Sequence, residues 1–261
     1  MIPMSTARTV LITGASAGIG QAFAHVFAEH GWHLVLTARR RERLEGLAEE
    51  LGERHGVTAH VIVADLADPA AGERIAREVA AAGVTLDGLV NNAGYAVAAR
   101  YRHTTWEQQA RFLQVMVTAV AELTHRFVPG MVERRYGRII NVASIAGLIP
   151  GSAVGHTLYS ASKAFLVRFS QSLTVEVKKY GVHVTAVCPG MTHSEFHDVT
   201  GTREKVSRLP KWAWMDAPAV AREGYAASMK GRAVCVTGTA NKGLVLLSRL
   251  LPDEIVMRGA R

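Results

Sequence analysis

The sequence predicts a single α/β domain built on a doubly wound parallel sheet of about seven strands, with helices on both faces. Short apolar runs alternate with amphipathic helical patterns along the chain, which is typical of parallel strands joined by right-handed helical crossovers. A glycine-rich turn directly follows the first run. The chain has 261 residues, 49% of them hydrophobic, and is therefore long enough for one large core. In such a sheet, ligands bind at the carboxyl ends of the strands.

The apolar runs and the patterns between them define the expected elements in order. The predicted strands are the runs Val10–Thr13, Leu34–Thr37, Val61–Ala64, Leu89–Val90, Ile139–Val142, Val184–Val187 and Ala233–Val236. Helices are expected from Gly20 to Gly31, over Arg41–His55, from an N-cap at Asp68 with Pro69 through Val79, after a cap at Thr105, around Tyr159–Tyr180, and from Asp216 with Pro218 to about Gly231.

Composition argues against several other classes of protein. No apolar run reaches the ~20 residues that cross a bilayer, and residues 1–8 show no signal-peptide pattern. The formal net charge is +8, but the basic residues are spread along the chain without a nucleic-acid-binding module, so no nucleic-acid partner is expected. The 11 histidines are scattered and predict no metal site. Cys188 and Cys235 lie in strand-like runs and are expected to be free thiols in a reducing cytoplasm.

The first glycine turn, between Thr13 and Gly20, has the strand–turn–helix context of a dinucleotide site. Gly14 permits the tight turn, Gly18 lets the backbone approach a pyrophosphate, and Gly20 lets the next helix pack close to the strand. The helix start offers free N–H groups to the anion. The residues expected to bind a cofactor here are Gly14, Ser16, Gly18, Ile19 and Gly20. A glycine turn without a ligand is the alternative.

Tyr159 and Lys163 lie four residues apart in a predicted helix, so both side chains share one face. A nearby positive charge favours the phenolate form of a tyrosine, and we expect Lys163 to lower the Tyr159 pKa below its usual value of about 10. The pair would then exchange protons nearer neutral pH. By itself the spacing also fits an exposed helix face.

Five motifs in order make the chain similar to the short-chain dehydrogenase/reductase family. They are the glycine turn at Thr13–Gly20, Asn91-Asn92-Ala93-Gly94, the strand end at Ser144, the pair Tyr159 and Lys163, and Pro189-Gly190. The resemblance extends from about Thr9 to Phe196 and implies a Rossmann-like fold. It also implies hydride transfer between a nicotinamide and a carbonyl carbon, with Tyr159 as general acid or base. Lys163 would bind the nicotinamide ribose, and Ser144 would polarise the substrate oxygen.

The end of the second strand predicts NADP(H) as the cofactor. The position at which a related NAD enzyme carries an acid for the ribose is Ala38 here, and Arg39 and Arg40 follow it. Guanidinium groups suit a phosphate dianion, although a solvated helix start is the alternative. The resemblance assigns further cofactor contacts along the other strand ends, which are Asp65, Leu66, Asn91, Ala93, Gly94, Pro189, Gly190, Thr192 and Ser194. Asn91 is also expected to hold the central strands together.

Two departures from the family pattern concern the active site. The family usually has an asparagine in the fourth helix, where a kink and a water carry protons to the lysine, and this chain has Met116. Methionine is only a weak acceptor. The segment between Ser144 and Tyr159 is also longer than usual, and its extra length falls at 150–157. His156 in that loop is a candidate substrate contact, with a solvated histidine as the alternative.

These observations predict an NADPH-dependent enzyme that interconverts a hydrophobic ketone or aldehyde and an alcohol. The alternative is a catalytically weak NADP(H)-binding sensor or scaffold. The residues that indicate an apolar substrate pocket are Tyr95, Val97, Ile145, Leu148, Phe196 and Trp212. A lid is expected around 192–215, and an apolar and basic tail around 240–261 is expected to pack on the domain or on a partner subunit, with an anionic membrane surface as the alternative. By resemblance, the helices near Met116 and Tyr159 form a homodimer or homotetramer.

Overall fold

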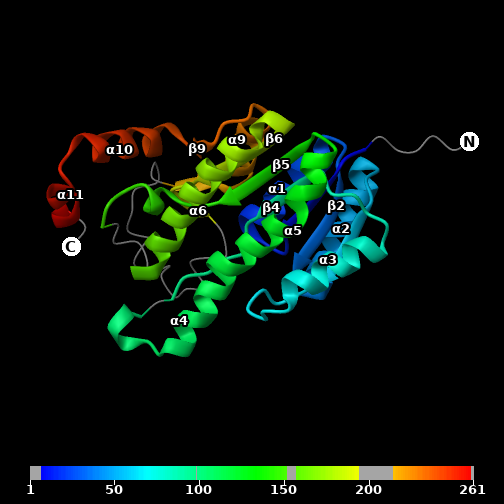
Figure 1. Cartoon of the computed structure of the whole chain (residues 1–261), viewed down its shortest axis with the longest axis horizontal. Coiled ribbons are helices and arrows are strands. Elements are labelled where there is room, and N and C mark those ends of the chain that lie inside the picture. Colours follow the sequence, from blue (N-terminus) through cyan, green and yellow to red (C-terminus); the bar gives the residue numbers. More distant parts are fainter. Residues whose placement is uncertain (1–6, 98, 152–156, 194–213, 260–261) are drawn as a thin grey trace, which may run out of the picture.

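The computed structural model describes residues 7–97, 99–151, 157–193 and 214–259, and these form one domain around a seven-stranded parallel sheet (Figure 1). The order across the sheet is β3-β2-β1-β4-β5-β6-β9. Its strands are β1 (Thr9–Thr13), β2 (His33–Ala38), β3 (Ala59–Val63), β4 (Gly88–Asn91), β5 (Gly137–Val142), β6 (Val182–Cys188) and β9 (Val234–Val236). The predicted fold class and all seven predicted strands are thus confirmed.

Helices cover both faces of this sheet. The main ones are α1 (Gly18–Glu29), α2 (Arg41–His55), α3 (Ala71–Ala81), α4 (Trp106–Leu113), α5 (Ala119–Glu133), α6 (Thr157–Val177), α9 (Ala217–Met229), α10 (Thr239–Leu250) and α11 (Asp253–Gly259). Short helical turns complete the list: η1 (Tyr101–His103), η2 (Gln114–Thr118), η3 (Ile145–Gly147) and η4 (Lys178–Tyr180). Helices α1, α2 and α9 share one buried cluster with the sheet, and α3, α4, α5 and α6 share the other.

Successive residues of a strand pack alternately into these two clusters. In β1, Val10 and Ile12 pack under α1, whereas Leu11 between them packs with the cluster on the opposite face. All three are completely buried. Because successive strand side chains point to opposite faces, a strand covered on both sides must be apolar throughout. The run that predicted β1 is apolar for this reason.

The order in which the strands are added reverses beside β1, and this reversal creates a crevice. From β1 the chain winds outward through β2 to β3, and then crosses back so that β4 pairs with the other edge of β1. The loops after β1 and β4 therefore separate at their carboxyl ends. Open α/β sheets bind ligands at this kind of switch point.

Local details differ from the prediction in two places. Helix α3 begins at Ala71 rather than at an Asp68 N-cap, because the Asp68 carboxylate instead accepts the Ala70 N–H at 2.9 Å in a turn before the helix. A small parallel sheet, β7 (Met191–His193) with β8 (Trp214–Asp216), was not predicted. The Thr105 cap is confirmed as a full capping box with Gln108.

Several expectations fall outside the described residues. The predicted lid at 192–215 is described only where β7 and β8 bound it, and Ser194, Phe196, Trp212 and His156 are not described. The predicted tail forms α10 and α11, which lie at the end of the molecule away from the N-terminus (Figure 1). No helix among the described residues is both long and apolar enough to cross a membrane. Within 7–97, 99–151, 157–193 and 214–259, no cluster of three potential metal ligands occurs.

Candidate active site

One cavity of about 780 Å³ opens at the carboxyl ends of the central strands. Its walls come from the loops after β1, β2, β3, β4, β5 and β6, together with α6. The predicted site residues that line it are Gly14, Ser16, Gly18, Ile19, Arg39, Arg40, Asp65, Leu66, Ala93, Gly94, Ser144, Tyr159, Lys163, Pro189, Gly190 and Thr192. Gly20 and Asn91 lie outside its lining, and Ser194 is not among the described residues. Residues far apart in the sequence are thus brought to one site.

The glycine turn has the backbone conformation that its residues predict. Gly14 and Gly18 have φ values of +67° and +57°, which L side chains rarely adopt. Gly20 serves packing instead of ligand contact, because a Cβ there would collide with the Gly14 carbonyl and the Asn92 side chain. The start of α1 is therefore held against the end of β1, with its free N–H groups at the cavity.

Asn92 locks this turn in place, a role that the sequence did not reveal. Its side-chain amide donates to the carbonyl oxygens of Thr13 at 3.0 Å and Gly14 at 3.2 Å. The Thr13 hydroxyl in turn accepts from the backbone N–H groups of Asn92 and Ala93, both at 3.0 Å. The loops after β1 and β4 are thereby joined at the switch point. The Asn-Asn-Ala-Gly motif signalled the site, but only the fold places Asn92 against the glycine turn.

Asn91 lies below the cavity and connects strands. Its amide donates to Asn141 Oδ1 at 2.8 Å and to Thr124 Oγ1 at 3.1 Å, and Asn141 donates to Ser170 Oγ at 2.9 Å. All four residues are buried. The expected link between the central strands is therefore present, as a polar chain from α5 through β4 and β5 to α6. Asn91 does not line the cavity, and its contact with a cofactor stays a prediction.

The charges after β2 and β1 suit an anionic nucleotide. Ala38 ends β2 as a buried, uncharged residue, and Arg39 and Arg40 follow it as exposed residues on the cavity wall. The Arg40 guanidinium donates to the Ser16 hydroxyl at 3.1 Å and to the Ser16 carbonyl at 3.3 Å. This places one guanidinium beside the glycine turn. A phosphorylated dinucleotide fits the donor set, because backbone N–H groups and two arginines face the same space.

An ion pair that the sequence did not predict joins two residues of the cavity lining. Arg111 of α4 lies 2.9 Å from the Asp65 carboxylate, which also accepts the Ala67 N–H at 3.0 Å. Both charged residues line the cavity. Arg111 is 46 positions from Asp65 along the chain, and its partner cannot be identified from helical spacing. The carboxylate predicted to contact the cofactor therefore already has a counter-charge from α4.

Ser144 and Tyr159 bring two hydroxyl groups together in the cavity lining. Ser144 lies two residues after the end of β5, and its Oγ accepts the Ala146 N–H at 3.1 Å, which orients the side chain at the start of η3. Burial raises the pKa of Tyr159 to about 12, and a hydrogen bond with Ser144 opposes this rise. Both side chains are buried in the protein but reach the cavity wall.

Lys163 lies one turn from Tyr159 on α6, with its Nζ 5.6 Å from the centre of the Tyr159 ring. Its ammonium donates to the Val142 carbonyl oxygen at 2.7 Å. Burial lowers the Lys163 pKa to about 8. The expected downward shift of the Tyr159 pKa is wrong for this structure, because desolvation of the phenolate outweighs the favourable interactions. The predicted proximity of the two groups is nevertheless present.

Met116 lies in a π-helical turn, η2, between α4 and α5. Its side chain is 1% exposed, and its sulfur lies next to Gly94, where a Cβ would be 2.9 Å away. The local distortion expected in the fourth helix is therefore present, although the residue inside it is apolar. π-turns within helices are frequent at functional sites.

Three of the residues predicted to form an apolar substrate pocket line the cavity: Tyr95, Val97 and Ile145. Leu148 packs against the cluster beside α6 instead. Burial raises the pKa of Tyr95, so this phenol stays neutral at physiological pH. The lining of the cavity is thus partly apolar.

Known proteins with a similar sequence or fold provide independent information. A model of the short chain dehydrogenase family matches residues 8–205. Sulfoacetaldehyde reductase 2 from Chromohalobacter salexigens is 39% identical over 189 residues, which is 72% of this chain and 73% of that protein. A short-chain dehydrogenase from Sphingobium yanoikuyae in complex with NADPH has 32% identity and a TM-score of 0.79, with 93% of each chain covered. A 3-oxoacyl-[acyl-carrier protein] reductase from Brucella melitensis with bound NAD has 26% identity and a TM-score of 0.76, with 88% of each chain covered.

Proposed function

The chain belongs to the short-chain dehydrogenase family, and from this premise we propose that it is an NADPH-dependent oxidoreductase that reduces a hydrophobic ketone or aldehyde, or oxidises the matching alcohol. The family match and the relatives support an NAD(P)-dependent oxidoreductase that acts on carbonyl and alcohol groups.

The observation that carries the proposal is the meeting of Ser144 and Tyr159 in the cavity that also contains the glycine turn. A nucleotide-binding protein without chemistry needs the glycine turn and the arginines, but it does not need two buried hydroxyl groups and a buried ammonium. Buried hydroxyl and ammonium groups cost free energy, and proteins retain them where they act on a ligand.

The side chains divide the proton chemistry between them. NADPH, when bound, supplies the hydride. Tyr159, whose pKa is raised to about 12, is a phenol at neutral pH and can donate a proton to the oxygen of a reduced carbonyl. Ser144 donates a hydrogen bond to the same oxygen and stabilises the negative charge that develops there. Lys163 stands one turn away with a pKa of about 8, so it can accept or release a proton near neutral pH.

The preference for NADPH over NADH rests on the end of β2. Ala38 offers no carboxylate to a ribose hydroxyl, and Arg39 and Arg40 place guanidinium groups on the cavity wall. A bidentate guanidinium contact with a phosphate is charge-assisted and contributes more than a neutral hydrogen bond. The arginines therefore favour the phosphorylated dinucleotide.

The proposed substrate is apolar because Tyr95, Val97 and Ile145 line the same cavity as Ser144 and Tyr159. A cytoplasmic location and small-molecule substrate complete the proposal. The location is supported by Cys188 and Cys235, which are both free thiols.

A second function, an NADP(H)-binding sensor or scaffold with weak catalysis, is favoured by Met116. This buried side chain occupies the π-turn without the hydrogen-bonding capacity that a proton path needs. The retained Ser144, Tyr159 and Lys163 favour the enzyme instead.

Loss of NADPH absorbance with a panel of hydrophobic ketones and aldehydes tests both functions. We expect turnover with at least one member, and we expect Tyr159→Phe to reduce kcat by two orders of magnitude or more while leaving the Kd for NADPH within about threefold. Tight NADPH binding by the wild type without oxidation across the panel would favour the sensor. Unimpaired turnover by Tyr159→Phe on a true substrate would contradict the assigned mechanism.

A further inference from the structure

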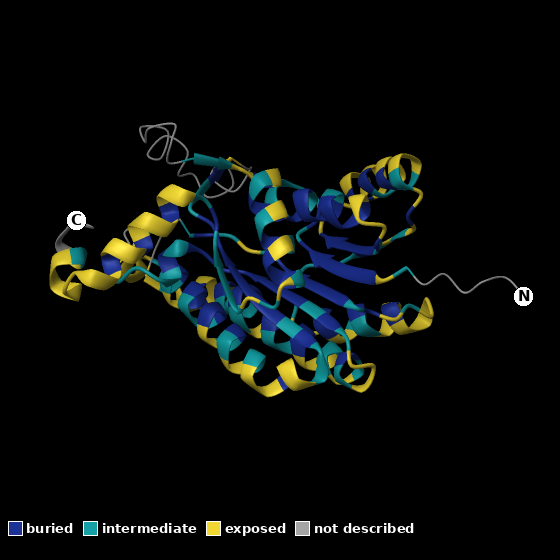
Figure 2. Ribbon diagram, turned by 90° about the horizontal axis from the view of Figure 1, so that it is seen from above, coloured by how far each residue is buried: buried dark blue, intermediate teal, exposed yellow. Residues whose placement is uncertain are grey.

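Helix α10 buries a polar side chain against the wall of the cavity. The helices nearest the C-terminus are largely exposed (Figure 2), and the buried residues of α10 are Asn241, Val245 and Ser248. Asn241 lies in the first turn of the helix and is 8% exposed. A Cβ built at Gly190, which lines the cavity, would collide with the Asn241 amide, with Nδ2 at 2.6 Å and Cγ at 2.7 Å. The amide therefore packs directly on the loop after β6.

We propose that Asn241 is a positioning residue for the active site, which fixes the backbone of residues 189–192 and through it the Ser144 hydroxyl group. Ser144 has a catalytic task only if a substrate oxygen is bound beside it, so this role rests on the proposed function. Asn241 itself does not line the cavity. It therefore acts on the reaction through the loop on which it packs, without touching substrate.

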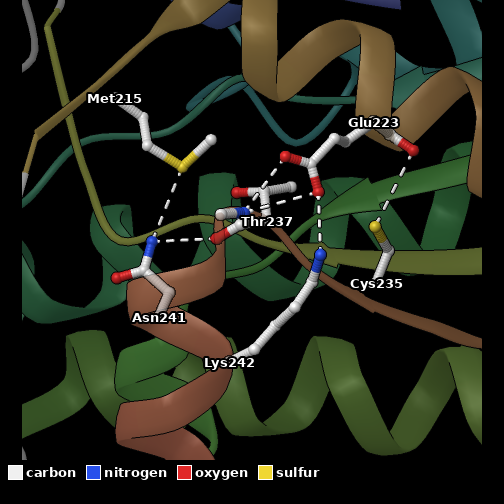
Figure 3. Close-up of polar contacts among 7 residues, drawn as sticks. Met215, Glu223, Cys235, Thr237, Asn241 and Lys242 are labelled. Carbon is white, nitrogen blue, oxygen red and sulfur yellow. Dashed lines mark hydrogen bonds and ion pairs between the residues drawn. The ribbon is translucent and has the colours of Figure 1, made fainter.

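Several contacts fix the Asn241 amide and the start of α10 (Figure 3). The Asn241 Nδ2 atom donates to the Thr237 carbonyl oxygen at 2.9 Å and lies 3.6 Å from the Met215 sulfur, which is a weak acceptor. The Glu223 carboxylate accepts the N–H group of Gly238, the residue directly before the helix, at 3.1 Å. Because the amide is both buried and hydrogen-bonded, it presents a defined surface to the loop after β6.

Asn241 contacts both residues that hold Thr192, a buried member of the cavity lining. The Thr192 hydroxyl donates to the Gly190 carbonyl oxygen at 3.2 Å. In the small sheet of β7 and β8, Thr192 is paired with Met215. Since Asn241 packs on Gly190 and donates to the Met215 sulfur, a change of its side chain disturbs Thr192 from two sides.

The same loop reaches Ser144 through the carbonyl group of Pro189. This carbonyl oxygen accepts the Ile145 N–H at 3.0 Å and the Ser144 hydroxyl at 3.4 Å. The second bond is longer than usual for a hydroxyl donor and is therefore weak, so Ser144 can exchange it for a bond to a substrate oxygen. The position of the Pro189 carbonyl decides how readily that exchange occurs. Asn241, packed on the next residue, Gly190, holds the carbonyl in that position.

Gly190 is required at its position by space and not by backbone conformation. Its φ value lies outside the left-handed region, so an alanine can adopt the same backbone. The three atoms nearest to a Cβ built there all belong to Asn241, namely Oδ1, Nδ2 and Cγ. Asn241→Ala removes all three atoms. The collision that Gly190→Ala creates should therefore largely disappear in the double variant.

Thermal unfolding of the full chain without nucleotide tests the contact between Asn241 and Gly190. We expect the loss of Tm caused by Gly190→Ala to be at least halved when Asn241 is also replaced by alanine, because residues in contact do not contribute additively. Ser248→Ala is the matched control. Ser248 is similarly buried on α10 and donates to the Val245 carbonyl oxygen at 2.9 Å, so its loss of Tm should simply add to that of Gly190→Ala. Equal losses from Gly190→Ala in the wild-type and Asn241→Ala backgrounds overturn the proposal.

Turnover by Asn241→Ala measures the positioning itself. With a ketone that the wild type reduces, we expect kcat per folded molecule to fall about tenfold, while the KM for the ketone and the Kd for NADPH stay within about threefold. The kinetic isotope effect with NADPH deuterated at the transferred hydrogen should be at least as large as in the wild type, because the hydride step has become slower. Ser248→Ala should retain the wild-type kcat. If Asn241 only stabilises the fold, both variants retain kcat per folded molecule, and that result overturns the proposal.

Failure of the proposed function gives a different result. A wild type that binds NADPH but reduces no ketone or aldehyde contradicts the proposed function, whereas the unfolding experiment still decides whether Asn241 holds Gly190. The positioning is then measured by the fluorescence emission of bound NADPH, which arises from its nicotinamide ring. An emission maximum that shifts in Asn241→Ala but not in Ser248→Ala would support the role of Asn241, and an unchanged maximum in both variants would overturn it.

Discussion

Lys163 directs its ammonium at the Val142 carbonyl oxygen, 2.7 Å away, and not at the Tyr159 hydroxyl one turn before it. This bond connects α6 to Val142, the last residue of β5, two residues before Ser144. A buried ammonium with one backbone acceptor remains poorly solvated, which is why the Lys163 pKa falls to about 8. Lys163 therefore lowers the free energy of unfolding at neutral pH, although its ammonium group belongs to the candidate active site.

A Lys163→Met variant should be more stable than the wild type at pH 7, and inactive. The pKa of Lys163 is lower in the folded protein than in the unfolded chain. Between pH 8 and 10.5 the unfolded chain therefore binds more protons at this residue, and the free energy of unfolding rises with pH in that range. At pH 7 the buried charge of Lys163 lowers the free energy of unfolding by on the order of 3 kcal/mol, which corresponds to this pKa shift. Loss of the bond to Val142 offsets about 1 kcal/mol of the gain. Denaturant unfolding at several pH values measures the difference.

The stability difference between Lys163→Met and the wild type should shrink between pH 7 and pH 9.5. The Tyr159 pKa is raised to about 12, so its destabilising effect begins only above the unfolded value of about 10 and does not affect this range. Lys163→Arg is the control, because it retains a charge at every pH in the range and should show no such shrinkage. A gap that stays constant with pH would contradict the depressed lysine pKa.

Arg39→Ser should weaken NADPH binding at least tenfold and change NADH binding less than twofold. The reason is that a charge-assisted contact to a phosphate contributes about 1.5–3 kcal/mol, whereas an uncharged ribose hydroxyl does not need the guanidinium. Arg41→Ser is the matched control, since Arg41 is exposed on the same segment but pairs with Glu45 at 3.2 Å and does not line the cavity. Fluorescence titration with both nucleotides gives the Kd values. Equal losses for NADPH and NADH would refute the role of Arg39 in discrimination.

Arg111→Gln should weaken NADPH binding three- to tenfold with almost no change in Tm. Without Arg111, the Asp65 carboxylate faces an anionic nucleotide with no counter-charge. The pair itself is exposed and stabilises the fold by no more than about 1 kcal/mol. The double variant with Asp65→Asn should recover part of the lost affinity, because the repulsive charge is gone. Additive losses in the double variant, measured by calorimetric titration, would contradict this explanation.

The sequence predicted the parts of the site that depend on local pattern. The glycine turn followed from Gly14, Gly18 and Gly20 between an apolar run and a helical pattern, and each glycine has the backbone or packing role expected of it. The strands were recognised because β1 is buried on both faces and therefore apolar throughout. These features are encoded within a few residues of one another.

The remaining parts depend on distant packing and could not be predicted. The Arg111 partner is set by how α4 lies over the loop after β3, and the Asn92 partner by the approach of the loops after β1 and β4. The Tyr159 pKa depends on burial, which the four-residue spacing to Lys163 does not reveal. The Asp68 carboxylate accepts a hydrogen bond in the turn before α3 instead of capping the helix. Local pattern does not decide this, because the two alternative hydrogen bonds are of similar strength.

Met116→Asn should lower stability and raise kcat. The methionine is almost fully buried and fills the space next to Gly94, so a smaller amide there leaves a void and a desolvated polar group, at a cost on the order of 2–4 kcal/mol. The π-turn is already formed, and an amide inside it can hold the water that the methionine cannot. Met116→Leu conserves volume and should leave both quantities nearly unchanged. Thermal unfolding and steady-state turnover measure the two effects. A fall in kcat for Met116→Asn without loss of folded protein would show that proton transfer in this chain does not pass through the π-turn.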